Sequence, residues 1–194
     1  RAGSPMGIGP GTSAVATHSG RKGSRMIVYA VSAGEGILAI SPIPGGDGDY
    51  AGDVQHLIEW KPAIVISLVS EVELVAARAA GLWHDLVEAG CRWEHLPISD
   101  FGVPDAEFEE AWPEVSANAR RALTGGGRIL VHCRGGCGRS GMVALRLMIE
   151  LGEAPDDALA RLRVVRSCAV ETDAQMAWAL AAKRAPAVFL RHED

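Results

Sequence analysis

The sequence predicts an α/β fold in which a central, mainly parallel sheet is flanked by helices. Short apolar segments of strand length alternate with longer segments whose apolar residues recur at helical spacing. Residues 63–69 form an almost unbroken apolar run, which is typical of a parallel strand covered on both faces. Another apolar segment, residues 128–131, leads through a glycine-rich loop into an apolar helix. This alternation indicates a sheet that lies between layers of helices.

The strands are expected where apolar residues gather between turn residues. The first two, residues 27–31 and 36–40, are close enough in sequence to form an antiparallel pair that turns at residues 33–35. The prolines and glycines of residues 42–46 then form a loop. Further strands are expected at residues 63–69, 91–96 and 128–131.

Glycine and proline set the limits of the helices. Pro62 ends the first helix, Gly81 separates the second from the third, and Gly90 closes the third. Asp105 follows Pro104 and is expected to cap the fourth helix. The helices are therefore expected over residues 49–60, 71–80, 82–89, 105–123, 140–151, 155–166 and 172–184.

The composition is that of a soluble globular protein, with 48% hydrophobic and 22% charged residues. The 194 residues suffice for one domain with a substantial core, which we expect at residues 26–194. Residues 1–25 are rich in Gly, Ser, Thr and Pro and are expected to form a flexible tail. No apolar run approaches the roughly 18 residues of a membrane span, so none is expected.

The charge disfavours nucleic acid as a partner. The net charge is −5, and residues 1–25 hold four of the 19 basic residues and no acidic one. The rest of the chain therefore carries 15 basic against 24 acidic residues, and such an acidic body repels a phosphate backbone.

The cysteines indicate a reduced setting. Cys91, Cys133, Cys137 and Cys168 are spaced irregularly, which is not typical of a disulfide framework in a chain of this size. We therefore expect unpaired cysteines and a cytoplasmic location.

The segment of residues 129–141 carries the chemistry. It predicts a strand, a tight loop and the start of a helix, and such a loop turns successive backbone N–H groups inward to form an anion site. Cys133 stands at the end of the strand, and Arg139 follows six positions later at the start of the helix. A thiolate and a guanidinium at one anion site predict phosphoryl transfer to sulfur. The expected phosphate-binding residues are Arg134, Gly135, Gly136, Cys137, Gly138 and Arg139.

Each side chain around this loop has an expected role. The Cys133 thiolate would attack phosphorus to form a phosphocysteine, which water then hydrolyses. The Arg139 guanidinium would bind two phosphate oxygens in a forked geometry that lysine cannot provide. Ser140 would donate a hydrogen bond to the sulfur or act as a helix-cap hydroxyl. His132 would fix the loop, or serve as an ordinary core histidine.

The mechanism also needs a proton donor for the leaving oxygen. Asp100, on a proline-bracketed loop 33 residues before the cysteine, is the first candidate. Asp105 is the alternative acid, although its place after Pro104 is typical of a helix cap.

Two motifs resemble those of one enzyme family. His132-Cys133-x5-Arg139-Ser140 resembles the signature of the cysteine-dependent protein tyrosine phosphatases. Residues 96–105 resemble the general-acid loop of the dual-specificity members, especially the cyclin-dependent-kinase-associated type. The resemblance covers roughly residues 36–184. It implies hydrolysis of phosphotyrosine in proteins, with phosphoserine and phosphothreonine as further substrates, no metal or organic cofactor, and Asp100 as the acid.

The resemblance also draws attention to Gln175, since a glutamine in this region positions the hydrolytic water in the larger tyrosine-specific members. An ordinary surface helix residue is the alternative. The Trp-Pro-Asp loop and the phosphotyrosine-clamping loop of those members are not recognisable in this sequence, which leaves the choice between tyrosine-only and dual specificity open.

Two loop residues leave alternatives open. Arg134 adds a positive charge at the rim that suits an acidic phosphopeptide or a phosphoinositide. Cys137 is either a small loop filler or a redox partner that captures an oxidised Cys133. A zinc site at these cysteines is not expected, because the metal would occupy the nucleophile. A phosphoprotein-binding pseudophosphatase and a rhodanese-like sulfurtransferase are the competing functions; the latter typically has a shorter loop.

Overall fold

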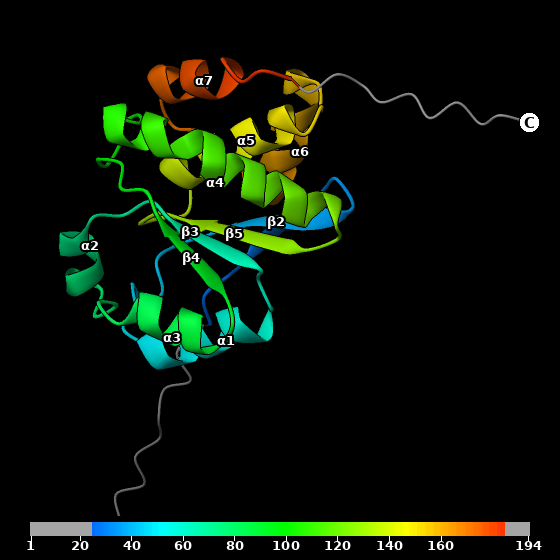
Figure 1. Ribbon diagram of the computed structural model, residues 1–194. Helices are drawn as coiled ribbons and strands as arrows, with labels where there is room; N and C mark the ends of the chain where they lie inside the picture. Colours follow the sequence, from blue (N-terminus) through cyan, green and yellow to red (C-terminus); the bar gives the residue numbers. More distant parts are fainter. Residues whose placement is uncertain (1–24, 185–194) are drawn as a thin grey trace, which may run out of the picture.

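The computed structural model describes residues 25–184, which form a sheet of five strands with helices on both faces (Figure 1). The strands are β1 (Tyr29–Ala33), β2 (Gly36–Ser41), β3 (Ile64–Ser67), β4 (Arg92–His95) and β5 (Arg128–His132). Their order is β1-β2-β5-β3-β4, and only β1 runs antiparallel to its neighbour. The predicted α/β class is confirmed; the sheet is mixed because the first two strands form a hairpin. Residues 1–24, which hold almost all of the expected tail, lie outside the described residues.

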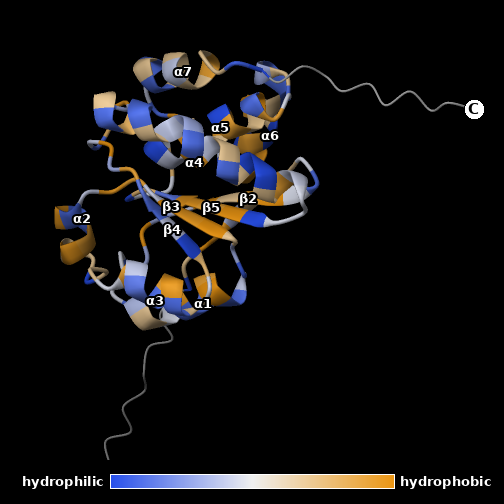
Figure 2. Cartoon of the chain, viewed as in Figure 1, coloured by the Kyte–Doolittle hydropathy of each residue, from blue (hydrophilic) through white to orange (hydrophobic). Residues whose placement is uncertain are grey.

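The seven helices of the described chain fall into two layers. On one side lie α1 (Tyr50–Glu59), α2 (Glu71–Ala76) and α3 (Leu82–Glu88), and on the other α4 (Ala106–Thr124), α5 (Gly138–Glu150), α6 (Pro155–Val165) and α7 (Asp173–Leu180) (Figure 1). Each layer closes its own hydrophobic cluster against the sheet. Figure 2 shows the inner strands β2, β3 and β5 as largely hydrophobic ribbons, whereas the edge strand β4 is more hydrophilic.

The largest departures from the expected boundaries are at β1, α2 and α7, while the other elements agree to within about two residues. β1 begins at Tyr29 and includes Ala33, because Ala33 pairs with Gly36 and leaves a two-residue turn. Gly34 has a φ of +58° in this turn, a conformation that glycine adopts readily. Helix α2 ends at Ala76, ahead of Arg78, which also has a positive φ. Helix α7 ends at Leu180, four residues before the expected boundary.

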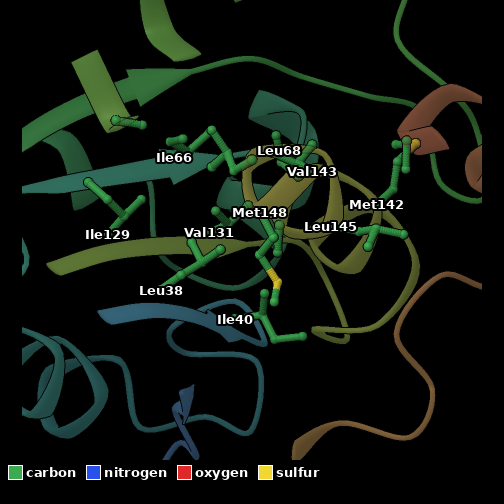
Figure 3. Packing of buried hydrophobic residues seen from close by; sticks show 14 of the residues in the cluster. Leu38, Ile40, Ile66, Leu68, Ile129, Val131, Met142, Val143, Leu145 and Met148 are labelled. Carbon is green, nitrogen blue, oxygen red and sulfur yellow. The ribbon is translucent and has the colours of Figure 1, made fainter. Parts of the chain in front are cut away.

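The central strand divides its side chains between the two clusters. Ile129 and Val131 of β5 pack toward α5, whereas Leu130 packs toward the opposite layer. Figure 3 shows Val131 beside Met148 of α5, with Ile129 farther along the strand. All residues of α5 except Arg146 and Glu150 are buried, as the apolar sequence of this helix predicts. Strand β5 and helix α5 are thus both fixed by core packing, and the loop between them is held at its two ends.

Candidate active site

The candidate site lies where the parallel strands end. Ser41 of β2 and Ser67 of β3 both pair in register with His132, the last residue of β5. In sheets of this type, ligands bind at the carboxyl ends of the strands. A cavity of about 300 Å³ opens here, and it is lined by Asp100, Phe101, Cys133, Arg134, Gly135, Cys137, Gly138, Arg139 and Glu171.

The backbone carbonyls of the loop all point away from this cavity. The Ile43 N–H donates to the Arg134 carbonyl at 3.1 Å. The Arg166 guanidinium donates to the carbonyls of Gly135 and Gly136 at 3.0 and 3.1 Å. The Cys137 carbonyl accepts from the Gly141 and Val170 N–H groups.

The opposite edge of the same peptides therefore faces the cavity. The backbone N–H groups of Arg134 to Cys137 have no acceptor within residues 25–184. Helix α5 begins at Gly138 and adds the positive end of its dipole. Successive inward N–H groups in front of a helix start are an arrangement that binds anions.

Gly136 is required for this loop shape. Its φ is +69°, and a Cβ atom at this position would lie 2.6 Å from the Pro42 nitrogen and from the Ser41 carbonyl carbon. Gly135 is different, because a Cβ atom there would meet nothing within 4 Å. The loop thus packs tightly against the end of β2 at one glycine and is open at its neighbour.

Cys133 presents its sulfur to Ser140. The thiol is 3% exposed, and its Sγ lies 3.3 Å from Ser140 Oγ. Cys137 occupies the cap position of α5, so the Ser140 hydroxyl serves the sulfur and not the helix end. Cys91 is the other free cysteine; burial raises its pKa, which keeps it protonated and unreactive.

Arg139 is held by Glu73, a residue that the sequence analysis did not single out. Arg139 is buried, and its Nη1 and Nη2 donate to the two Glu73 carboxylate oxygens at 3.0 and 2.8 Å. Nη1 also donates to the Ile98 carbonyl at 2.9 Å. This paired geometry fixes the plane of the guanidinium.

The pair stays charged over a wide pH range. Partial burial disfavours the charged form of Glu73, yet hydrogen bonds from Arg139 and from the Ser70 N–H outweigh burial and hold the pKa of Glu73 below its usual range. Desolvation likewise opposes the charge of Arg139, but the hydrogen bonds to Glu73 and the nearby Cys133 raise its pKa. Glu73 itself is oriented by a capping box with Ser70 at the start of α2.

The structure separates the two candidate acids. Asp100 lines the cavity, where its Oδ1 lies 3.2 Å from Arg139 Nη2 and its Oδ2 lies 3.8 Å from Arg134 Nη1. Asp105 lies outside this cavity and caps α4 by accepting from the Phe108 N–H at 2.9 Å. Only Asp100 therefore stands where it can reach a bound group. Phe101 follows it with a φ of +57° and exposes its ring at the rim.

His132 is buried and belongs to a chain of hydrogen bonds. Trp93 Nε1 donates to Ser67 Oγ at 2.8 Å, and Ser67 Oγ lies 2.5 Å from His132 Nε2. Because Ser67 Oγ accepts from Trp93, its own proton is donated to His132 Nε2. The ring proton of His132 is then on Nδ1, which donates to the Cys133 carbonyl at 3.4 Å. Desolvation lowers the pKa of His132 to about 4, so the imidazole is neutral near pH 7.

Gln175 is buried, so the interpretation of an ordinary surface residue is wrong. Its Oε1 accepts from the Glu171 and Thr172 N–H groups at 3.0 and 3.3 Å, and its Nε2 donates to the Gly102 carbonyl at 3.2 Å. Gln175 thus ties the acid loop to the segment before α7.

The family assignment follows from a match that spans this whole site. The model of the family described as "Swiss Army Knife protein, DSP-PTPase phosphatase domain" matches residues 47–188, which include every residue from Glu73 to Gln175. The chain belongs to this family. The sequence resemblance to dual-specificity phosphatases of the cyclin-dependent-kinase-associated type is confirmed.

Individual relatives agree with the DSP-PTPase assignment. Cyclin-dependent kinase inhibitor 3 of Rattus norvegicus is 35% identical over 103 residues, which cover 52% of this chain and 47% of that protein. The chain thus matches about half the length of this relative. Kinase-associated phosphatase, solved with its catalytic-site cysteine replaced by serine, shares the fold with a TM-score of 0.70 at 24% identity, covering 80% of this chain and 93% of that one. The active form of Tk-PTP gives a TM-score of 0.59 at 27% identity, covering 73% and 87%.

The DSP-PTPase domain contains a disulfide that the sequence analysis excluded. Cys137 of the phosphate loop is bonded to Cys168, 31 residues later, while Cys91 and Cys133 are free. The expectation of unpaired cysteines is therefore wrong for Cys137 and Cys168, and Cys137 carries no free thiol that could capture an oxidised Cys133. The pairing arises because the turn after α6 lies against the loop, which sequence spacing does not reveal. Disulfides persist mainly in oxidising compartments, so this bond weighs against the reduced setting that we expected.

Arg166 is the second residue of the site that sequence reasoning missed. Besides its bonds to the loop carbonyls, its guanidinium stacks on the Tyr29 ring at 4.3 Å and donates to the Tyr29 hydroxyl at 2.9 Å. The cation therefore lies behind the phosphate loop of the DSP-PTPase domain.

Among the described helices, none is both long and apolar enough to cross a membrane.

Proposed function

We propose that the chain hydrolyses phosphate monoesters in proteins, on tyrosine and also on serine or threonine, through a phosphocysteine intermediate. The observation that supports this most is the convergence of the Cys133 thiol and the Arg139 guanidinium on one cavity whose loop turns its N–H groups inward. Such a cavity complements the charge of a phosphoryl group during transfer.

Binding uses the loop and the arginine together. The inward N–H groups of residues 134–137 donate to the phosphate oxygens, and Arg139 adds charge-assisted bonds. Because Glu73 fixes the guanidinium plane, the arginine does not have to reorganise when charge develops in the transition state. Arg134 adds a second cation at the rim.

In the first step, the Cys133 thiolate attacks phosphorus. An S–P bond forms while the bond from phosphorus to the ester oxygen breaks, and protonated Asp100 gives its proton to that oxygen. The position of Asp100 in the wall of the cavity supports this role. The products of the step are the free alcohol or phenol and a phosphocysteine.

In the second step, water attacks the phosphocysteine. The Asp100 carboxylate takes a proton from the water, a new P–O bond forms, and the S–P bond breaks. The thiolate leaves with a hydrogen bond from the Ser140 hydroxyl, 3.3 Å away. Inorganic phosphate is released, and Asp100 again carries the proton that the next cycle needs.

His132 and Gln175 act by positioning. The neutral His132 holds the Cys133 carbonyl, and Gln175 holds the acid loop through Gly102. The amide of Gln175 is engaged with backbone groups through both its oxygen and its nitrogen, so we do not assign it to the hydrolytic water.

Hydrolysis of a generic aryl phosphate, in chelator and without metal, tests the proposal. Wild type should turn over and be inhibited by vanadate, whereas Cys133→Ser should be inactive and still bind vanadate. A wild type that binds vanadate without turnover would instead indicate a phosphoprotein-binding pseudophosphatase.

A further inference from the structure

A second, larger pocket opens beside the phosphate site. Its volume is about 540 Å³, which falls in the range of pockets that bury organic ligands. Arg134 and Gly135 line both this pocket and the phosphate cavity, so the two adjoin at the first residues of the loop. A group bound to the loop can therefore extend directly into this second pocket, which we call the flanking pocket.

The walls of the flanking pocket are mostly apolar. Pro42 and Ile43 follow β2, and Val72 and Ala76 lie on α2. Val72 is 78% exposed, so this branched apolar side chain is largely without partners within residues 25–184. The next residue along the helix, Glu73, holds Arg139. The wall is therefore fixed in position relative to the phosphate-binding arginine.

Apart from Arg134, which lies on the wall shared with the phosphate cavity, the charged residues that line the flanking pocket are all acidic. Its lining carboxylates are Asp47, Asp53 and Glu73. Asp53 is buried and accepts from the Met26 and Gly45 N–H groups at 3.0 and 2.8 Å, and Glu73 is bound to Arg139. Asp47 is exposed and makes no ion pair with the described residues, so its charge is free to act on a ligand.

We propose that the flanking pocket binds a bulky apolar side chain of a phosphopeptide substrate, two residues from the phosphorylated residue, and that Asp47 selects a basic residue next to it. This inference rests on the proposed phosphatase activity and names the substrate class of the same site. Side chains two residues apart in an extended peptide lie on the same face, about 6.6 Å from one another, which suits two pockets that share a wall. The free carboxylate of Asp47 in the pocket lining disfavours an anionic lipid surface, which is why a peptide is the occupant.

The test compares matched phosphotyrosine peptides that carry leucine or serine two residues before or after the phosphorylated residue. Wild type should prefer a leucine peptide by about tenfold in kcat/KM, since loss of one apolar group in a pocket typically costs 10- to 200-fold. Val72→Asn should reduce this preference to about twofold or less. Val75→Asn is the matched control, because Val75 is 65% exposed on the same helix and does not line the pocket; it should keep the tenfold preference.

The charge preference has its own comparison. A peptide with arginine beyond the leucine should exceed the same peptide with glutamine by about threefold at low salt, and Asp47→Asn should remove this difference. Equal rates for the leucine and serine peptides in wild type would overturn the proposal. So would a Val72→Asn variant that keeps the peptide preference but loses turnover of a phosphoinositide in neutral vesicles, since the occupant would then be a lipid.

Failure of the proposed function is distinguishable from failure of this pocket. If wild type does not hydrolyse a generic aryl phosphate, the phosphatase activity fails and the inference falls with it. If wild type hydrolyses the aryl phosphate but shows equal kcat/KM for the leucine and serine peptides, only the proposed role of the flanking pocket is refuted.

Discussion

Glu73 binds Arg139 through both carboxylate oxygens, at 3.0 and 2.8 Å, across 66 residues of sequence. The pair joins the start of α2 to the start of α5. The short helix α2 therefore takes part in shaping the phosphate site, although it lies on the opposite side of the sheet from α5 (Figure 1).

Replacing this carboxylate should weaken both catalysis and stability. Glu73→Gln removes the charge partner of a buried guanidinium, so the free energy of unfolding should fall by about 1–3 kcal/mol. Without a fixed guanidinium plane, kcat/KM for an aryl phosphate should fall by at least about tenfold. Urea titrations and steady-state kinetics measure the two effects. Glu71→Gln, an exposed neighbour on the same helix, is the control and should leave both unchanged.

The two aspartates of the acid loop should respond differently. Asp100→Asn removes the proposed proton donor and should lower kcat for an aryl phosphate by about 10²-fold or more. Asp105→Asn keeps an acceptor at the N-cap of α4 and should leave kcat within about twofold. The pH profile of kcat should lose its dependence on a protonated acid only in Asp100→Asn. The reverse order of effects would assign the acid to Asp105.

Buried, neutral His132 should make the protein less stable in mild acid. Its pKa in the fold is about 4, whereas the unfolded value is near 6.5, so between these pH values the unfolded chain binds a proton that the folded one does not. The free energy of unfolding should therefore drop by about 2 kcal/mol from pH 6.5 to pH 5. The lowered pKa of Glu73 adds a loss in the same direction below its ordinary value of 4.5.

Denaturant unfolding at each pH checks this expectation. His132→Asn should flatten the dependence between pH 6.5 and 5, and the exposed His84→Asn should not change it. An equally steep decline in His132→Asn would show that another group carries the effect.

Reduction of the disulfide should loosen the phosphate loop. The Cys137–Cys168 bond closes a segment of 31 residues, and such a cross-link typically contributes about 2–4 kcal/mol. A Cys137→Ser/Cys168→Ser double variant should lose about this much free energy of unfolding. In Cys91→Ser, whose thiol is unpaired, the disulfide remains, so reductant should still lower the free energy of unfolding; in the double variant it should not. Thiol titration of the denatured, unreduced chain should find two thiols; four would contradict the disulfide.

The sequence was sufficient for the parts of the site that are local. The strand, loop and helix around Cys133 and Arg139 follow from an apolar run, closely spaced glycines and another apolar run, because short-range sterics and burial decide them. Asp100 could be preferred as the acid because Asp105 occupies an expected helix-cap position, and the family resemblance pointed to the same residue. Where glycine or proline marked the end of a hairpin strand or a helix, the predicted boundary fell within a few residues of the observed one.

The residues that support the loop were missed because tertiary contacts bring them there. Arg166 reaches the loop from the end of α6, and no pattern around it indicates this. Glu73 did leave a signal, since Ser70-x-x-Glu73 is a capping box, as is Thr172-x-x-Gln175 around the glutamine that the resemblance had pointed to. A capping box predicts that the Glu or Gln side chain bonds to the backbone at the start of its helix. It does not predict which residues of other elements that side chain contacts.

The central claim is a covalent phosphocysteine at Cys133. We would mix the wild-type protein with an aryl phosphate, quench in acid within milliseconds, and search the peptide that contains residue 133 for added phosphate by mass spectrometry. The account predicts a phosphate on Cys133, its absence in Cys133→Ser, and a phosphocysteine that persists longer in Asp100→Asn if the leaving group needs no proton. Turnover without any phosphate on Cys133, in wild type and in Asp100→Asn alike, would contradict it.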